Sequence, residues 1–142
     1  GYLQASPMQV AVLFAAIANG GKRIQPHLVQ DNKPDSAYQT DLDLESSTLE
    51  TVRRSLRAVV TSGTGKALSG GLPPVAGKSG TAEDPPRETH AWFAGYAPFD
   101  KPEIVVVAFV ENGGGGGSVA GPVTRQVFAA YFAQKEKGQW QK

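Results

Sequence analysis

The chain has 142 residues, 40% of them apolar, which is the size of one ordinary domain and enough hydrophobic material to bury a core. Its formal net charge is +1, with acidic and basic residues interspersed, so the composition argues against a nucleic-acid partner. The absence of cysteine excludes disulfides and thiol nucleophiles, and two histidines far apart in the sequence, His27 and His90, argue against a metal site.

The first predicted helix begins at Pro7, with Ser6 as its N-cap, and ends before Gly20 and Gly21. Residues 8–18 are apolar on nearly every face of this helix. Such a helix must be buried on several sides, which in a chain of this length predicts packing against material outside the sequence.

A polar segment and a second helix follow. Residues 22–46 are predicted to form a loop, with short extended pieces near Ile24 and at residues 27–29. The second helix is predicted from Ser47, where Ser47 and Glu50 fit a capping box, to about Val60. Its apolar side would be formed by Leu49, Val52, Leu56 and Val59. The opposite side is expected to be solvated, with Glu50 as a local partner for the basic residues Arg53, Arg54 and Arg57.

Three strands are predicted next, at residues 75–82, 89–97 and 104–110. The connections between them are short, which favours an antiparallel meander. After a run of glycines at residues 113–117, a last helix is predicted at residues 122–133, with Val123, Val127 and Tyr131 on one face and Phe128 and Phe132 beside it. The fold class is therefore α+β, a three-stranded antiparallel sheet covered by helices.

Several conspicuous residues have ordinary structural explanations. His90 is expected to be a strand residue with satisfied hydrogen bonds, and Glu83 and Asp84 are expected to be turn residues. The glycine run is expected to be a flexible loop, because no Lys-Ser/Thr pair follows it as a phosphate-binding loop would require. The aromatic residues of the strands are expected in the core or on a sheet face: Trp92, Phe93, Tyr96 and Phe109. Trp92 or Tyr96 could instead border a groove.

The tract with chemical content is Lys78-Ser79-Gly80-Thr81, inside the first predicted strand. Lys78 would supply a fixed positive charge beside a serine that must lose its proton, and would attract a peptide carboxylate. The hydroxyls of Ser79 and Thr81 alternate onto one face, so both can donate to that carboxylate. Gly80 would let a substrate approach the backbone closely. A Lys-Ser/Thr-Gly tripeptide alone occurs by chance in about one chain in ten of this size, and would then be an ordinary edge strand with a solvated lysine.

The surrounding segments extend this pattern. The chain carries, in this order, GYLQASPMQ at residues 1–9, AGKSGTAE at 76–83, HAWFAGYAP at 90–98 and AGP at 120–122. These segments resemble landmarks of class B penicillin-binding proteins and, within that class, of the elongation-type penicillin-binding protein 2, which serves cell-wall growth and cell shape. The resemblance implies the serine β-lactamase/transpeptidase fold, with residues 78–81 as one wall of the active-site cleft.

The resemblance also implies roles for single residues. Lys78 and Thr81 would be catalytic, Thr81 through its backbone N–H as one of two oxyanion-hole donors, and Ser79, Gly80 and Thr81 would bind substrate. The substrate would be a peptidoglycan stem peptide ending in D-Ala-D-Ala, or a β-lactam that mimics it. No metal or organic cofactor is implied.

The sequence departs from the family pattern at the nucleophile. The family requires a Ser-x-x-Lys motif and a Ser-x-Asn motif, and no serine in this chain fits either one. The chain also begins with Gly1 rather than Met. We therefore expect residues 1–133 to be the C-terminal portion of one transpeptidase domain, followed by a polar tail at 134–142. Alone, the chain is expected to be soluble and inactive, and to self-associate through apolar surface that the missing N-terminal part would cover.

Alternatives remain at this point. A D,D-carboxypeptidase or β-lactamase of the same fold would differ in using water rather than an amine to release the acyl group. A non-catalytic module that binds peptides by strand pairing would require the chain to be complete. For the enzyme reading, the resemblance implies a full-length protein anchored in the plasma membrane, with its catalytic domain outside the cytoplasm.

Overall fold

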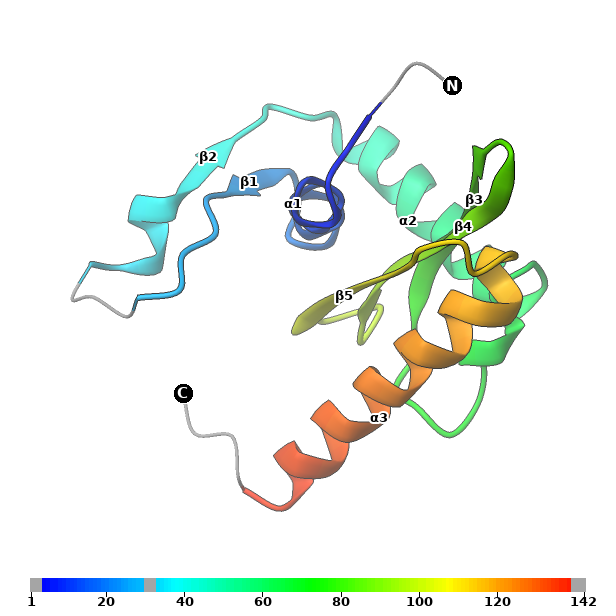
Figure 1. Cartoon of the computed structure of the whole chain (residues 1–142). Coiled ribbons are helices and arrows are strands. Elements are labelled where there is room, and N and C mark those ends of the chain that lie inside the picture. The colour runs from blue at the N-terminus through cyan, green and yellow to red at the C-terminus, as the bar shows by residue number, and fades with distance from the viewer. Residues whose placement is uncertain (1–3, 30–32, 139–142) are drawn as a thin grey trace.

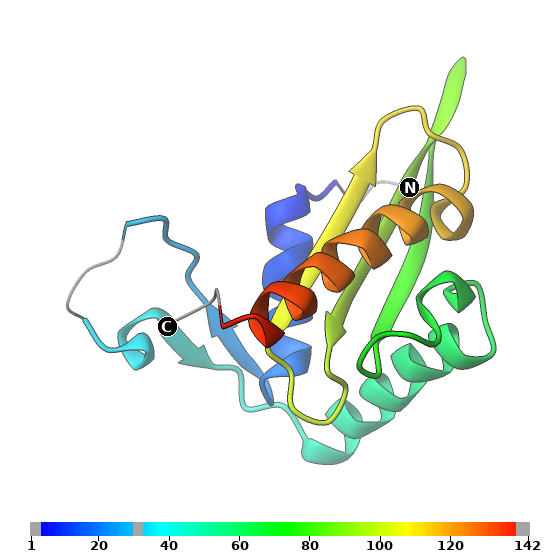
Figure 2. The same ribbon diagram turned by 90° about the horizontal axis from the view of Figure 1, so that it is seen from below.

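The computed structural model describes residues 4–29 and 33–138, and for Asp35 the backbone only. A three-stranded antiparallel sheet in the order β3-β4-β5 forms its centre, from β3 (Ala76–Asp84), β4 (Arg87–Ala97) and β5 (Ile104–Val110). Helix α1 (Pro7–Ala18) packs on one face of the sheet and α3 (Gly121–Glu136) on the other (Figures 1 and 2). The predicted α+β class is confirmed.

The core has two parts, one on each side of the sheet. Tyr96 and Ala94 face α1 and its Phe14, whereas Phe93 faces α3 and its Phe128. Helix α2 (Ser46–Thr61) lies beside β3 and contributes to both parts, because Leu56 packs on the α1 side and Val60 on the α3 side. Burial of Tyr96 raises the pKa of its hydroxyl, and the nearby Arg53 offsets part of that rise.

Helix α1 begins as predicted. The Ser6 Oγ accepts a hydrogen bond from the Gln9 backbone N–H (3.3 Å), and the Gln9 Oε1 accepts one from the Ser6 backbone N–H (2.7 Å), which completes a capping box. The helix ends at Ala18, shortly before Gly20 and Gly21, whose φ values of +87° and +95° suit glycine. The predicted burial on several sides is incomplete among the described residues: Met8 is 57% exposed and Leu13 58%.

The segment after α1 contains more structure than predicted. Two short strands, β1 (Lys22–Ile24) and β2 (Gln39–Asp41), pair antiparallel and project from the body as an arm (Figure 1). The predicted extended piece at residues 27–29 is wrong, because these residues form no strand. The ring of His27 instead stacks on that of Tyr38, at a centroid distance of 4.1 Å. Tyr38 is the last residue of a 3-10 turn at Asp35–Tyr38.

Helix α2 starts at Ser46, one residue earlier than predicted, and the predicted capping box is wrong. Its N-cap is Glu45, which makes no capping hydrogen bond with its side chain, and Ser47 lies inside the first turn. The buried residues of α2 are Leu49, Leu56 and Val60. The stripe therefore runs through Val60, while Val52 is 36% exposed.

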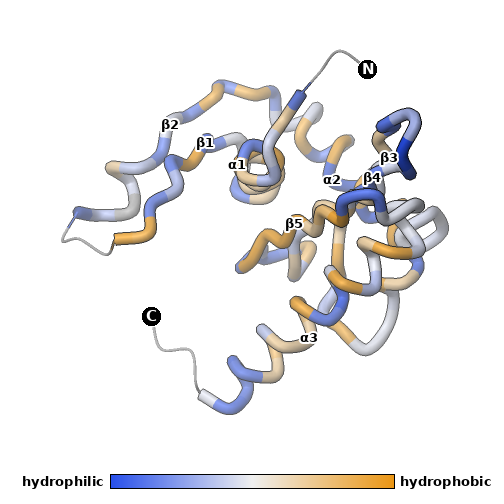
Figure 3. The backbone as a smooth tube through the Cα atoms, in the orientation of Figure 1, coloured by the Kyte–Doolittle hydropathy of each residue, from blue (hydrophilic) through white to orange (hydrophobic). Residues whose placement is uncertain are grey.

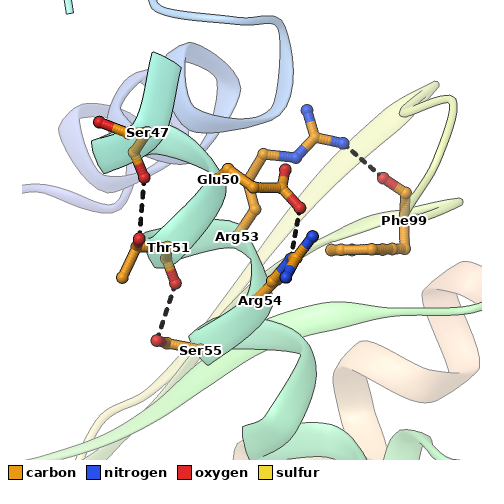
Figure 4. Close-up of polar contacts among 7 residues, drawn as sticks. All are labelled: Ser47, Glu50, Thr51, Arg53, Arg54, Ser55 and Phe99. Carbon is orange, nitrogen blue, oxygen red and sulfur yellow. Dashed lines mark hydrogen bonds and ion pairs between the residues drawn. The ribbon is translucent and has the colours of Figure 1, made fainter. Parts of the chain in front are cut away.

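Two of the three basic residues of α2 are not solvated, contrary to the prediction. The Arg53 guanidinium donates to the carbonyl oxygens of Ala18 (3.1 Å) and Phe99 (2.7 Å), and Figure 4 shows the bond to Phe99. The Arg57 guanidinium donates to the carbonyl oxygen of Val75 (2.7 Å). Charge-assisted hydrogen bonds of this kind satisfy backbone carbonyl groups that would otherwise be unpaired. They tie α2 to α1, to the β4–β5 turn and to β3. Of the three basic residues, Arg54 is the one that makes an exposed ion pair within the helix, with Glu50 (2.6 Å), as predicted.

The meander is confirmed, with two differences at its ends. Strand β3 continues to Asp84 through an irregularity between Ala82 and Asp84, so Glu83 and Asp84 belong to the strand and not to a turn. At the hairpin tip, Arg87 pairs with Asp84 (2.8 Å), and the hydrogen bond between them raises the pKa of Arg87. Strand β5 has the predicted bounds, and its apolar residues stand out in Figure 3.

A π-helical turn at Gly116–Ala120 leads into α3, which continues to Glu136. The buried side of α3 is formed by Thr124 and Phe128, with Phe132 packed beside them. The face that carries Val123 and Val127 is not the buried one, since these residues are 43% and 44% exposed. Among the helices in the described part of the chain, none has the length and apolar character needed to cross a bilayer.

Candidate active-site wall

The tract Lys78-Ser79-Gly80-Thr81 lies in β3, at an edge of the sheet (Figure 1). Ser79 pairs with Phe93 of β4 and Thr81 pairs with Ala91, and both partners belong to the core on the α3 side. Since cross-strand partners share a face, Ser79 and Thr81 lie on one face of β3. Lys78 pairs with Ala94 and leaves from the other face, but its ammonium bends to the strand edge and donates to the Ser79 carbonyl oxygen (2.6 Å).

The edge of β3 that faces away from β4 presents backbone groups that the sheet does not pair. The carbonyl oxygens of Ser79 and of Val75, the residue before β3, accept hydrogen bonds from the side chains of Lys78 and Arg57 instead. In an antiparallel pair, the N–H and C=O of one residue point to the same side, and every second residue repeats that direction. The backbone N–H of Thr81 therefore points away from β4, toward the open edge.

The Ser79 hydroxyl is held by a residue that the sequence did not single out. This residue is Thr64, in the glycine-rich break after α2, and its Oγ1 lies 2.6 Å from Ser79 Oγ. The break is held against α2 by a hydrogen bond from the Gly65 N–H to the Val59 carbonyl oxygen (2.9 Å). If Thr64 is the donor, the Ser79 proton remains free to bind a ligand.

The glycine run forms a close backbone contact rather than the flexible loop predicted for it. The Gly116 N–H donates to Thr81 Oγ1 (3.3 Å), which leaves the hydroxyl proton of Thr81 available. A Cβ on Gly116 would lie 2.2 Å from the Gly80 carbonyl oxygen and 2.5 Å from that of Trp92. Gly116 is therefore required for the turn before α3 to lie directly against β3 and β4.

A groove of about 830 Å³ continues the edge beyond Thr81. It is lined by Gln4, Ala5, Val10, Thr81, Ala82, Glu83, His90, Trp92 and Phe109. His90 is a satisfied strand residue, as predicted: its Nδ1 accepts from the Asn112 N–H (3.0 Å), and its Nε2 lies 3.5 Å from Asp84 Oδ2. Of the two aromatic residues considered for a groove, Trp92 borders it and Tyr96 is buried in the core.

The family model described as "Penicillin binding protein transpeptidase domain" matches residues 1–129. The chain belongs to this family. It is 35% identical to the peptidoglycan D,D-transpeptidase MrdA of Haemophilus influenzae over 95% of its own length and 25% of that protein. It thus spans about a quarter of the length of that relative.

Solved structures of transpeptidases agree with this family. Pseudomonas aeruginosa PBP2, in complex with WCK 5153, matches this chain with 36% identity and a TM-score of 0.77, over 92% of this chain and 31% of that one. Penicillin-binding protein A from M. tuberculosis, as an imipenem acyl-enzyme, matches with 28% identity and a TM-score of 0.78, over 93% and 32%. The resemblance to class B penicillin-binding proteins and the serine transpeptidase fold is confirmed.

The residues predicted for the site from the sequence, Lys78 to Thr81, lie in one strand at an edge of the sheet. Sequence reasoning missed Thr64, Gly116 and the groove. The only sequence signals for the first two were the glycine-rich segments in which they lie. Neither segment indicates which strand it will contact.

Proposed function

We propose that this chain forms the substrate-binding wall of a serine D,D-transpeptidase that cross-links peptidoglycan. The observation that carries the proposal is the edge of β3: the Lys78 ammonium and the outward N–H of Thr81 lie along it, and the hydroxyls of Ser79 and Thr81 lie on one face of the same strand. A cation and hydroxyl donors suit the carboxylate that ends a stem peptide. An N–H aimed at open space suits an oxyanion.

In the proposed reaction, the donor peptide lies along β3 with its terminal carboxylate against the hydroxyls of Ser79 and Thr81. A serine of a Ser-x-x-Lys motif, elsewhere in the full-length protein, attacks the carbonyl carbon of the penultimate D-Ala. The Thr81 N–H stabilises the resulting oxyanion. The terminal D-Ala leaves as the amine, taking up a proton, and an amine of a neighbouring stem peptide then attacks the ester and releases the serine.

Lys78 has two roles in this proposal. Its positive charge favours loss of the proton from the attacking serine, and it attracts the anionic end of the substrate. Lys78 is exposed and lies at the strand edge, so its ammonium can turn from the Ser79 carbonyl oxygen toward an incoming group. Gly80, between the two hydroxyl residues, has no side chain, so the peptide could approach the strand backbone closely at this point.

The names of the relatives favour transpeptidation over hydrolysis. MrdA of Haemophilus influenzae is named a peptidoglycan D,D-transpeptidase, and the M. tuberculosis protein was solved as an imipenem acyl-enzyme. A carboxypeptidase or β-lactamase would use the same wall but transfer the acyl group to water. We further propose, from the family resemblance, that the full-length protein is anchored in the plasma membrane and acts outside the cytoplasm.

The isolated 142-residue chain tests whether the nucleophile lies outside this part of the protein. We expect a fluorescent penicillin to label the full-length protein but not the isolated chain, because no serine here has the nucleophile motif. We also expect the isolated chain to sediment as oligomers, since Met8, Leu13 and the edge of β5 have no cover among the described residues. Labelling of the isolated chain would show that the chain contains a nucleophile after all. A strictly monomeric species would contradict self-association.

A further inference from the structure

We propose that the groove beyond Thr81 is a subsite for the part of the donor that precedes its D-Ala-D-Ala terminus, and that Glu83 makes it select acyl chains carrying a protonated amine. This inference rests on the proposed function, because it takes the direction of the donor from the roles of Lys78 and Thr81. It adds a specificity-determining residue outside the Lys-Ser-Gly-Thr tract.

The direction of the donor follows from the order of groups along β3. The cation of Lys78 and the hydroxyl of Ser79 come before the outward N–H of Thr81 in the strand. A donor whose carboxylate meets the first groups and whose scissile carbonyl meets the Thr81 N–H must continue past Thr81. It then runs along Ala82 and Glu83, and both residues line the groove.

The floor of the groove is aromatic. The rings of Trp92 and Phe109, on neighbouring strands, lie with their centroids 4.5 Å apart, and His90 meets Phe109 edge-on at 5.3 Å. A volume of about 830 Å³ exceeds that of a single side chain and lies in the range of small-molecule sites. The methylene groups of an extended acyl chain can pack on this floor.

The charge of the groove comes from Glu83. Among the described residues, no cation lies within ion-pair distance of its carboxylate, whereas the neighbouring Asp84 is paired with Arg87 (2.8 Å). The Nδ1 of His90 is already engaged by the Asn112 N–H. An ammonium group in the groove would meet a free carboxylate and, over Trp92, the face of an indole ring. A neutral chain would gain only the apolar contact, and an anionic chain would be repelled.

Three penicillins that differ at one carbon of the acyl chain test this selection. Benzylpenicillin is neutral there, ampicillin carries an amine and carbenicillin a carboxylate. The full-length protein and its Glu83→Gln variant are compared by their acylation rate constants at slightly acid pH, at which the amine is protonated. We expect Glu83→Gln to lower the ampicillin-to-benzylpenicillin ratio about three- to fivefold, the size of an exposed ion pair, and to raise the carbenicillin-to-benzylpenicillin ratio. High salt should reduce the preference of the unchanged protein.

The matched control is Glu88→Gln, which removes an exposed carboxylate of the same hairpin that does not line the groove. Because each ratio is taken on one protein, a general loss of acylation cancels, and both ratios should stay unchanged in Glu88→Gln. Ratios that are the same in Glu83→Gln as in the unchanged protein would overturn the subsite and leave the transpeptidase proposal standing. Failure of the unchanged full-length protein to be acylated by all three penicillins would overturn both.

Discussion

Replacing Lys78 by alanine in the full-length protein is expected to lower the rate of labelling by a fluorescent penicillin about 100- to 1,000-fold. The ammonium of Lys78 is the cation of the tract at the edge of β3, where it donates to the Ser79 carbonyl oxygen. Its removal takes away the charge that would help the attacking serine lose its proton and would hold the substrate carboxylate. The measurement is the second-order rate constant of acylation.

The control is Lys101→Ala, which removes an exposed lysine from the turn between β4 and β5. This variant should be labelled within about twofold of the unchanged protein, because a surface charge far from the cleft is screened by salt. Equal labelling of Lys78→Ala and Lys101→Ala would leave Lys78 without the role assigned to it.

Replacing Gly116 by alanine is expected to destabilise the protein by about 3 kcal/mol and to reduce penicillin labelling. The added Cβ would lie 2.2 Å from the Gly80 carbonyl oxygen, and a backbone atom in a paired strand cannot move aside as a side chain can. Either the turn before α3 or strand β3 must shift. In both cases the hydrogen bond from the Gly116 N–H to Thr81 Oγ1 is lost. Thermal unfolding measures the loss of stability. Acylation kinetics measure the effect on the site.

The neighbouring glycine provides the control. Gly115 has a φ of −80°, and a Cβ there would approach only Ser118 Oγ, at 2.8 Å, which can rotate away. Gly115→Ala should therefore cost less than about 1 kcal/mol. An unfolding temperature of Gly116→Ala equal to that of Gly115→Ala would contradict the close contact between the turn and β3.

The sheet and the helices could be predicted because their signals are local. The run of β-branched residues fixed both ends of β5, and the cap at Ser6 with the pair Gly20-Gly21 marked α1. Of the arm, only an extended piece near Ile24, now part of β1, was predicted, and β2 was missed, because each strand has only three residues, too few to show a periodicity. The short polar strands are defined by their pairing with each other, which the sequence does not display.

The site could be predicted only in part, for a related reason. The Lys-Ser-Gly-Thr tract is contiguous, so the sequence shows it. The contacts that orient it come from far away in the chain: Thr64 reaches Ser79, and Gly116 reaches Thr81 across 35 residues. Arg53 likewise looked like a surface residue, because its partner carbonyls at Ala18 and Phe99 carry no side-chain signal.

A crystal structure of the full-length protein acylated by a β-lactam would show whether the edge of β3 binds substrate. We expect the carboxylate of the antibiotic to lie about 3 Å from the hydroxyl oxygens of Ser79 and Thr81, and the acyl carbonyl oxygen to accept a hydrogen bond from the Thr81 N–H. An acyl group that reaches neither these hydroxyls nor this N–H, with the edge of β3 open to solvent, would contradict this expectation.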